Sequence, residues 1–296
     1  MASSSPDSAK LKVLFPTKMS TLFVVATPIG NLEDMTYRAV RVLREVDWIA
    51  CEDTRESRKL LDHFEIKTPL VSYHDFNELE RAKELADRLK AGESGALVSD
   101  AGMPLVSDPG YRLVRAAIEA GIDVRPIPGA SATVTALAAS GLPTDSFQFL
   151  GFLPAKSGQR ANLLETLKGE KATLIFYEAP HRILDALADI ERVMGPRPVV
   201  VAREMTKIHE EFLRGTAGQI WDQLRSRDSI RGEITLLVGK SNRPAQPTEP
   251  METAMANQIG SGLSRMDAMK AIARERGISK REVYKHLAVR PVTRTK

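Results

Sequence analysis

Cysteine is almost absent from this chain of 296 residues. Its single cysteine, Cys51, excludes a disulfide within the chain and a cysteine-based zinc cluster, a pattern typical of a reducing compartment. Long apolar runs are also absent. The longest ones, such as Leu22 to Ala26 and Val199 to Ala202, are far shorter than the roughly 18 residues of a membrane-spanning helix. We therefore expect a soluble, cytoplasmic protein that makes no membrane contact.

Several familiar motifs are missing as well. Gly239 to Ser241 looks like the end of a phosphate-binding loop, but the glycine that such a loop needs five residues earlier is Ile234. His209 to Glu211 resembles the start of a zinc-protease helix, but Leu213 stands at the second ligand position. No G-x-G-x-x-G follows a predicted strand. ATP hydrolysis, zinc proteolysis and hydride transfer therefore have no support, and we expect no metal site.

Charge is distributed unevenly along the chain. Residues 240–296 contain 12 basic and 5 acidic residues, a net charge of +7, whereas residues 1–239 contain 30 and 33, a net charge of −3. A basic tail on a mildly acidic body is typical of an element that docks on a polyanion, and nucleic acid is favoured because no lipidation motif is present. A solvated pair of charged helices would have the same composition.

Residues 20–142 alternate between strand-forming and helix-forming runs, which predicts a parallel sheet with helices on its faces. We expect strands at 22–26, 48–51, 70–72, 96–99 and 123–127, and helices at 37–46, 57–64, 78–90, 111–120 and 131–139. Asp108 and Pro109 are expected to cap and begin the helix over 111–120, which Gly121 ends. Residues 1–19, rich in serine, are expected to form a disordered leader, with Met19 as an alternative start.

Residues 143–240 have longer strands and fewer helices, which predicts a second α/β domain with a mixed sheet. We expect strands at 147–153, 173–177, 199–202, 211–214 and 233–238, and helices at 160–167, 182–193 and 217–225. Three prolines within 241–250 predict a linker.

Residues 251–296 form the third predicted part, a basic tail that is similar to a helix-turn-helix. Its first helix carries one apolar face and ends at Gly277; the face consists of Leu263, Met266, Met269 and Ile272. Ser279 and Glu282 predict a capping box for the next helix, which exposes basic side chains. A three-helix unit that binds nothing would show the same apolar pattern.

Three loops of small residues, proline and glycine follow predicted parallel strands: Ala26 to Leu32, Ser99 to Pro104 and Pro126 to Ala132. The carboxyl ends of parallel strands meet at one edge of the sheet, where open α/β sheets bind ligands. Small residues also let the backbone approach a ligand closely. The sequence therefore predicts a ligand site made from these loops.

Six ordered motifs resemble the tetrapyrrole methylase family, in its branch of ribosomal RNA 2′-O-ribose methyltransferases. They are ATPIGNLEDMTYRA (26–39), EDTRES (52–57), SDAGMPLVSDPG (99–110), PGASA (128–132), FYEAPHR (176–182) and AREMTKIHEE (202–211). The resemblance covers about residues 20–240, and the tail resembles the helix-turn-helix extension of the same enzymes. It implies two α/β domains with S-adenosylmethionine in the cleft between them, a small helical extension, and a homodimer.

The resemblance also implies a reaction, the methylation of a cytidine ribose 2′-oxygen in the decoding region of 16S ribosomal RNA. The substrate is either the naked RNA or the assembled small ribosomal subunit. By similarity, the cofactor contacts are Thr27, Pro28, Asp100, Met103, Ser131, Ala132 and Tyr177, with Asp100 as the main polar anchor.

A ribose hydroxyl is a weak nucleophile, so a nearby base would help the reaction. The candidates, each near a predicted strand end, are Asp53, Glu178, His181 and Lys207, although each could equally have a structural role. Arginines suit bidentate phosphate contacts, and the expected RNA-binding residues are Arg55, Arg182, Arg203, Lys280, Arg281 and Lys285. Aromatic residues form only 5% of the chain, so we expect shape and phosphate contacts to dominate over stacked bases.

Two alternatives stay open. One is a methyltransferase acting on carbon or nitrogen of a tetrapyrrole, which a basic tail and a first loop of Thr27-Pro28-Ile29-Gly30 in place of a glycine-rich loop argue against. The other is a nucleic-acid-binding regulator whose α/β body senses a metabolite without catalysis.

Overall fold

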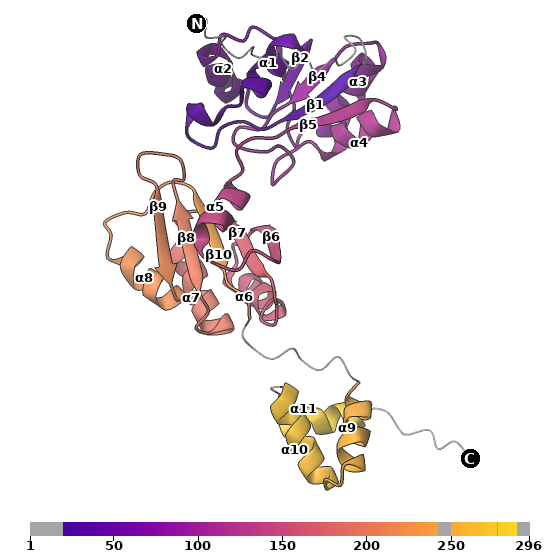
Figure 1. Ribbon diagram of the computed structural model, residues 1–296, viewed down its shortest axis with the longest axis vertical. Coiled ribbons are helices and arrows are strands. Elements are labelled where there is room, and N and C mark those ends of the chain that lie inside the picture. The colour runs from indigo at the N-terminus through magenta and orange to yellow at the C-terminus, as the bar shows by residue number, and fades with distance from the viewer. Residues whose placement is uncertain (1–19, 242–249, 277, 289–296) are drawn as a thin grey trace, which may run out of the picture.

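The computed structural model describes residues 20–241, 250–276 and 278–288, which form two α/β parts and a group of three helices (Figure 1). The expected leader and most of the expected linker lie outside the described residues. Within the described ranges, no helix is long and apolar enough to cross a membrane.

The first sheet contains five parallel strands in the order β3-β2-β4-β1-β5, as the alternating pattern predicts. Its strands are β1 (Thr21–Val25), β2 (Trp48–Cys51), β3 (Leu70–Ser72), β4 (Gly95–Leu97) and β5 (Asp123–Ile127). Its helices are α1 (Tyr37–Glu45), α2 (Thr54–His63), α3 (Glu78–Lys90) and α4 (Tyr111–Glu119), with a short 3₁₀ helix at Leu32–Asp34.

Helices cover both faces of this sheet because successive side chains of a strand point to opposite sides. In β2, Trp48 and Ala50 pack in one core with α3 and α4, whereas Ile49 and Cys51 pack in another core with α1 and α2. The central strands are thus mostly apolar on both faces, whereas the edge strand β5 carries Asp123 and Arg125.

The second sheet is mixed, in the order β6-β7-β10-β8-β9, which confirms the expected change of pattern. β6 and β7 are parallel, and the other neighbours are antiparallel. Its strands are β6 (Phe147–Phe152), β7 (Thr173–Glu178), β8 (Val199–Arg203), β9 (Glu211–Gly215) and β10 (Ile234–Val238). One face packs against α6 (Ser157–Thr166), α7 (Ile183–Met194) and α8 (Ala217–Arg225).

The other face of the second sheet is covered by α5 (Ala132–Ser140), the helix that follows the last strand of the first sheet (Figure 1). Ala136 and Leu137 of α5 join a core with Ile175 and Leu237 of the sheet, and Ile29 from the first loop enters the same core. The domain boundary at residue 142 stays a prediction, but α5 already packs with the second sheet and so ties the two α/β parts together.

The predicted cap of α4 is wrong. The helix begins at Tyr111, and Gly110, with a φ of +144°, occupies the N-cap position without a capping side chain. The Glu78 carboxylate accepts hydrogen bonds from the Gly110 amide at 3.2 Å and the Arg112 amide at 3.4 Å. A residue of α3 therefore caps α4, and Asp108 is left free for another role. The expected end of the helix at Gly121 is confirmed, since this residue has a φ of +74°.

The tail contains α9 (Met251–Gly260), α10 (Arg265–Arg276) and α11 (Lys280–Ala288) around a small core of its own. The capping box is confirmed, since the Ser279 amide donates to Glu282 at 2.8 Å and the Glu282 amide donates to the Ser279 hydroxyl at 3.2 Å. The expected apolar face is partly wrong because Leu263 and Met266 are 40% and 50% exposed. Gly277 lies outside the described residues.

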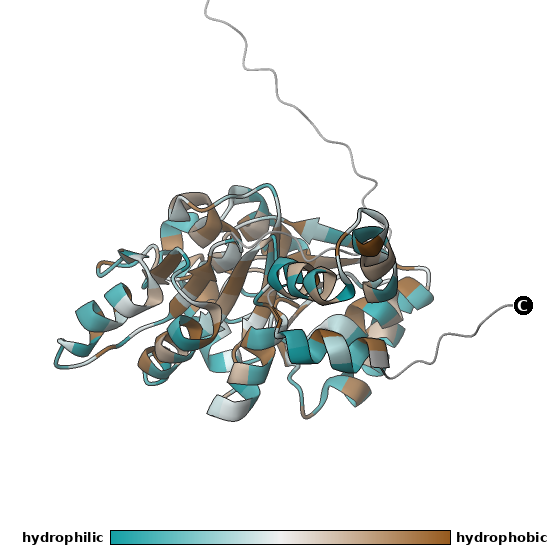
Figure 2. Cartoon of the chain, turned by 90° about the horizontal axis from the view of Figure 1, so that it is seen from below, coloured by the Kyte–Doolittle hydropathy of each residue, from teal (hydrophilic) through white to brown (hydrophobic). Residues whose placement is uncertain are grey.

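Figure 2 shows hydrophobic residues gathered along the strands and polar ones along the outer helices.

Candidate functional site

A cavity of about 370 Å³ lies where loops of the first sheet meet the second sheet and α5. This volume lies in the range of small-molecule sites. Its lining is mostly apolar and comes from both α/β parts; it includes Ile29, Met103, Val106, Ser107, Asp108, Ser131, Ala132, Phe152, Tyr177, Met205 and Glu233. Among the described residues, no group of three or more His, Cys, Asp or Glu side chains is placed to hold a metal ion.

Four of the expected cofactor residues, Met103, Ser131, Ala132 and Tyr177, line this cavity together. Ser131 is the N-cap of α5, and its side chain makes no capping bond to the first amides of that helix. Amides at a helix N-terminus attract an anion such as a carboxylate.

The first loop is held to the loop after β4 by hydrogen bonds of Thr27. Thr27 is buried, and its hydroxyl donates to the Ser99 carbonyl at 3.1 Å. Its backbone exchanges two hydrogen bonds with Gly102, at 2.9 and 3.1 Å. Thr27 and the buried Pro28 are absent from the lining. Thr27 therefore joins two of the predicted loops, and Ile29 is the residue of the first loop that reaches the cavity.

The expected polar anchor, Asp100, lies outside the lining. Its Oδ1 accepts a hydrogen bond from the Asp53 amide at 3.3 Å, and burial raises its pKa. Asp53 is the N-cap of α2: its carboxylate accepts from the Arg55 amide at 2.8 Å and pairs with the Arg55 guanidinium at 2.7 Å. These Arg55 contacts lower the pKa of Asp53 to about 2. Asp53 thus makes local structural contacts, and its catalytic role stays a prediction.

Asp108 is the carboxylate that the sequence pattern missed. Burial raises its pKa from 3.8 to about 6, and the nearby charges of Glu52 and Asp100 add to the rise, against a hydrogen bond from Ser99. It lies in the cavity wall in a loop where Leu105 and Ser107 have φ values of +70° and +72°. Positive φ in such residues is costly and often found at functional sites. In the sequence Asp108 precedes Pro109, a pair that predicts a helix start and so gives this carboxylate a capping role instead of a place at the site.

Tyr177 is held at the cavity by α5. Its hydroxyl lies 3.0 Å from the hydroxyl of Thr133, and its ring contacts Phe149 and Phe152 edge to face, with centroids 4.8 and 5.8 Å apart. Burial raises the pKa of Tyr177. Its hydroxyl is therefore neutral at physiological pH and serves to position the ring.

Glu178, a candidate base, is enclosed although its residue borders the cavity. Its side chain is fully buried, accepts from the Ala179 amide at 2.8 Å and pairs with Arg182 at 3.2 Å. Burial raises its pKa, and the Ala179 bond and the Arg182 charge oppose the rise. Since strand side chains alternate, Glu178 points to the face opposite Tyr177. These contacts favour a structural role.

The other two candidate bases have different surroundings. His181 is exposed and absent from the cavity lining. Lys207 pairs with Glu204 at 2.9 Å and with Glu233 at 3.0 Å; burial opposes its charge, but these carboxylates outweigh it and raise the pKa of the lysine. A Cβ on Gly30, which has a φ of +151°, would lie 2.5 Å from Lys207 Cγ. The ammonium group of Lys207 is thus a cation paired with two carboxylates of the second α/β part, while its aliphatic stem lies against Gly30 of the first loop.

The expected phosphate ligands also differ from one another. Arg55 is exposed, with 86% of its side chain accessible. Arg203 pairs with Glu211 at 3.0 Å and donates to the Arg231 carbonyl at 3.1 Å. Arg182 donates to the Leu153 carbonyl and is mostly buried. In the tail, the exposed side chains on α11 are those expected: Lys280, Arg281 and Lys285.

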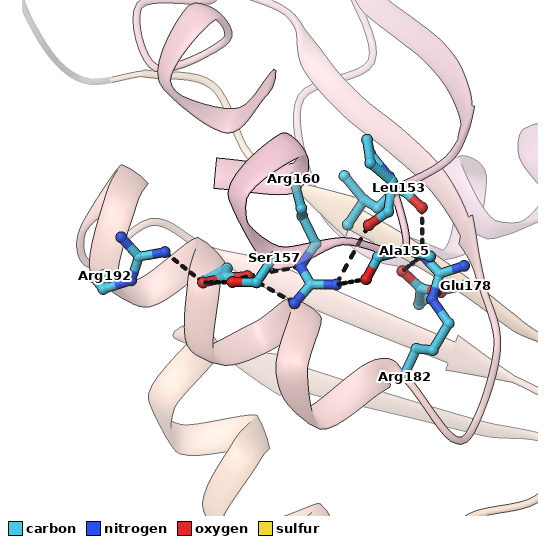
Figure 3. Close-up of polar contacts among 9 residues, drawn as sticks. Leu153, Ala155, Ser157, Arg160, Glu178, Arg182 and Arg192 are labelled. Atoms are coloured by element: carbon cyan, nitrogen blue, oxygen red, sulfur yellow. Dashed lines mark hydrogen bonds and ion pairs between the residues drawn. The ribbon is translucent and has the colours of Figure 1, made fainter. Parts of the chain in front are cut away.

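Arg182 belongs to a buried polar network that holds the loop after β6 (Figure 3). Arg160 of α6 donates to the carbonyls of Pro154 and Ala155, both at 3.4 Å. Its guanidinium pairs with Asp189 at 2.7 Å, and only 3% and 9% of the two side chains are exposed. Two arginines thus fix the backbone of residues 153–155 beside the cavity.

Comparisons with known proteins agree with this architecture. The family model described as Tetrapyrrole (Corrin/Porphyrin) Methylases matches residues 21–220. A protein of Halalkalibacterium halodurans, named ribosomal RNA small subunit methyltransferase I, is 52% identical over 89% of this chain and 93% of its own length. Proteins with the same name from Synechocystis and Bacillus subtilis are 47% and 44% identical over 90% of this chain, and cover 96% and 93% of their own lengths.

Solved structures share the fold at low sequence identity. A diphthine synthase matches with a TM-score of 0.57 and 17% identity over 74% of this chain and 89% of its own. The uroporphyrin-III C-methyltransferase of Thermus thermophilus matches with a TM-score of 0.53 and 21% identity over 75% and 94%. A further structure of that enzyme, complexed with S-adenyl homocysteine, has a TM-score of 0.50 and 18% identity over 74% and 97%. With the family model covering most of both α/β parts, the chain belongs to the tetrapyrrole methylase family.

Proposed function

We propose that this protein transfers a methyl group from S-adenosylmethionine to the ribose 2′-oxygen of a cytidine in the decoding region of 16S ribosomal RNA. The observation that carries the proposal is the cavity of about 370 Å³, formed by both α/β parts, in a chain whose relatives are named ribosomal RNA small subunit methyltransferase I. The basic tail supports a polyanionic substrate.

The cavity residues fit this cofactor chemically. Apolar side chains such as Ile29, Met103 and Met205 suit the flat faces of an adenosine group. The Asp108 carboxylate, with a pKa of about 6, is ionised at neutral pH and suits a positive charge. The amides at the start of α5, beside Ser131, suit a carboxylate. We propose that these groups, with Ala132 and Tyr177, hold the cofactor.

When bound, S-adenosylmethionine supplies an electrophilic methyl group on a sulfonium, whose departure leaves a neutral thioether. The protein's main contribution is then to place the ribose oxygen in line with that methyl group and to exclude water. The Thr27 contacts to Ser99 and Gly102 keep the loops of the first sheet in place for this purpose. A base that takes the hydroxyl proton would add to the rate.

Methyl transfer can be tested directly. We would incubate the protein with radiolabelled S-adenosylmethionine and, separately, with naked ribosomal RNA and with small ribosomal subunits from cells that lack the modification. Mapping the label to nucleotide and atom should place it on a ribose 2′-oxygen in the decoding region. Cofactor binding without label in either substrate would contradict the proposal and favour a tetrapyrrole substrate or a sensor.

The tail is proposed to bind the RNA through Lys280, Arg281 and Lys285. Exchanging all three for glutamate should weaken RNA binding and reduce the slope of log K against log salt by about 2 to 3, since each lost phosphate contact removes about 0.7 to 0.9. Cofactor affinity should not change. The control is the same exchange at three exposed lysines of the body, Lys59, Lys67 and Lys83. An equal loss in both triple variants would refute a specific role of the tail.

We also propose a homodimer that acts in the cytoplasm, where its substrate would be found. Phe76, Leu79 and Tyr111 are 99%, 74% and 65% exposed. Leu79 and Tyr111 follow Glu78 and Gly110 in the chain, and the Gly110 amide donates a hydrogen bond to the Glu78 carboxylate at 3.2 Å, which brings these two segments together. An exposed apolar group of this kind suits contact with a second copy. Sedimentation velocity of the wild type and of Phe76→Ser tests whether these residues form the dimer interface. The variant should have a larger dissociation constant and be monomeric at concentrations at which the wild type is a dimer.

A further inference from the structure

A β-bulge lies at the end of β6, beside the cavity. In the pairing of β6 with β7, Phe149 is opposite Ile175 and Phe152 is opposite Tyr177. Two residues of β6, Leu150 and Gly151, therefore stand against one residue of β7. Gly151 has a φ of +67°, a conformation that favours glycine. The extra residue reverses the alternation of side chains along the strand.

The bulge decides which way Phe152 points. Leu150 packs into the core on the α6 to α8 face of the sheet, whereas Phe149 packs on the α5 face. In a regular strand Phe152 would share the face of Leu150, because side chains two positions apart are on the same side. Instead its ring contacts Tyr177, as Phe149 does, and lines the cavity. The strand thus turns an aromatic ring from a packed core toward the site.

Phe152 combines exposure with a fixed position. The residue is 55% exposed, whereas Phe149 and Tyr177 are partly buried. The backbone after it is held by Arg182, which donates to Leu153, and by Arg160, which donates to Pro154 and Ala155 (Figure 3). An aromatic ring on a rigid backbone loses little entropy when it binds a flat partner.

The first α/β part contributes to the same edge of the cavity. A Cβ on Gly151 would lie 3.8 Å from the Ser107 hydroxyl, in the loop that carries Asp108. The rest of the lining includes aliphatic side chains such as Ile29 and Met205, which suit the cofactor, while Phe152 is 55% exposed at the edge. The ring is therefore available to a second molecule that approaches the cavity from outside.

We propose that Phe152 is the stacking platform for the base of the target nucleotide. The inference rests on the proposed function, in which the target ribose must approach the cavity; taking its nucleotide out of the RNA stack, as enzymes that act on bases do, gives this access. An unstacked base finds a replacement partner in an aromatic side chain. Such stacking tolerates any base, so Phe152 supports affinity and positioning rather than the choice of cytidine.

The test compares side chains at this position in the full-length protein. Phe152→Leu keeps an apolar side chain but removes the aromatic face, and Phe152→Tyr keeps that face. With small ribosomal subunits or ribosomal RNA lacking the modification, Phe152→Leu should raise KM about 5- to 150-fold, the range of base stacking on aromatic residues. Phe152→Tyr should stay within about threefold of the wild type, and the Kd for S-adenosylmethionine within about twofold in both variants.

The matched control is Phe147→Leu at the opposite end of β6, where the ring is 46% exposed and away from the cavity lining. Its KM for RNA should not change. An unchanged KM in Phe152→Leu would overturn the inference while leaving the proposed function intact. A Kd for S-adenosylmethionine that rises with the KM would assign the ring to the cofactor, and a change in oligomeric state would assign it to an interface. If the wild-type protein transferred no methyl group to RNA, the proposed function would fail first.

Discussion

Asp108→Asn should make the protein more stable and its cofactor site weaker at the same time. The carboxylate lines the cavity, where burial and the neighbouring charges of Glu52 and Asp100 raise its pKa from 3.8 to about 6. At neutral pH the folded protein therefore holds a negative charge on Asp108 that is partly buried and repelled by neighbouring carboxylates, which lowers its stability. Asparagine has nearly the same shape without the charge, so the substitution removes this cost.

The size of the effect follows from the pKa. A difference of about two pH units, at about 1.4 kcal/mol each, corresponds to about 3 kcal/mol. Because Asp108 is partly exposed, solvent screening reduces this, and we expect a gain of about 1.5 kcal/mol for Asp108→Asn at pH 7.5. A carboxyl group whose pKa is raised on folding costs nothing below pH 3.8, where it is protonated in both states, and its full cost is reached above pH 6. At pH 4.5 the gain should fall to about a third of its value at pH 7.5.

Urea unfolding at the two pH values measures the stability, and calorimetry measures the Kd for S-adenosylmethionine. Loss of the opposite charge should weaken binding about 5- to 30-fold, the equivalent of about 1 to 2 kcal/mol. S-adenosylhomocysteine, which lacks the sulfonium charge, should lose less. Asp228→Asn, at an exposed position outside the lining, is the control. A gain that does not depend on pH, or unchanged cofactor affinity, would refute the role given to Asp108.

Two further predictions concern the framework of the site. Arg160→Met should lower the free energy of unfolding by about 3 kcal/mol in urea titrations, because it leaves the buried Asp189 carboxylate without its enclosed partner; a loss below about 1 kcal/mol would contradict this. Gly30→Ala should lower the free energy of unfolding by about 1 to 3 kcal/mol, because the alanine backbone would have to adopt a φ of +151° and its Cβ would meet Lys207. Gly92→Ala is the matched control, with a φ of +101° and no atom within 4 Å of the added Cβ, and equal losses in the two variants would argue against the Lys207 contact.

Much of the cavity could be predicted from local sequence. Met103, Ser131 and Ala132 lie in loops that the sequence predicts to meet, because each loop follows a parallel strand and such strand ends share one edge of a sheet. Their role as cofactor contacts is implied by the family resemblance alone. Their sheet formed as expected, since its central strands are mostly apolar and alternate with amphipathic helices. Here the information is local: periodicity over about ten residues is enough to choose helix or strand.

The sequence pattern does not predict which groups the polar side chains bind in the folded protein. Arg182 and Arg203 have the chemistry of phosphate ligands, but in the fold they bind Leu153 and Glu211. A charged side chain enclosed by folding needs a partner within a few ångströms, and the chain brings that partner from a different element. The same side chain left in water would have remained available to RNA.

By itself the sequence determined the order of the elements, the two kinds of sheet and the loops that meet at the ligand site. Only the tertiary structure decided that Asp108 enters the cavity wall, because Glu78 of α3 takes over the capping of α4. Likewise, only the pairing of β6 with β7 turns Phe152 toward the site. Secondary structure follows from preferences of neighbouring residues, whereas hydrogen-bond partners and strand register are selected by contacts between distant segments, which no local pattern contains.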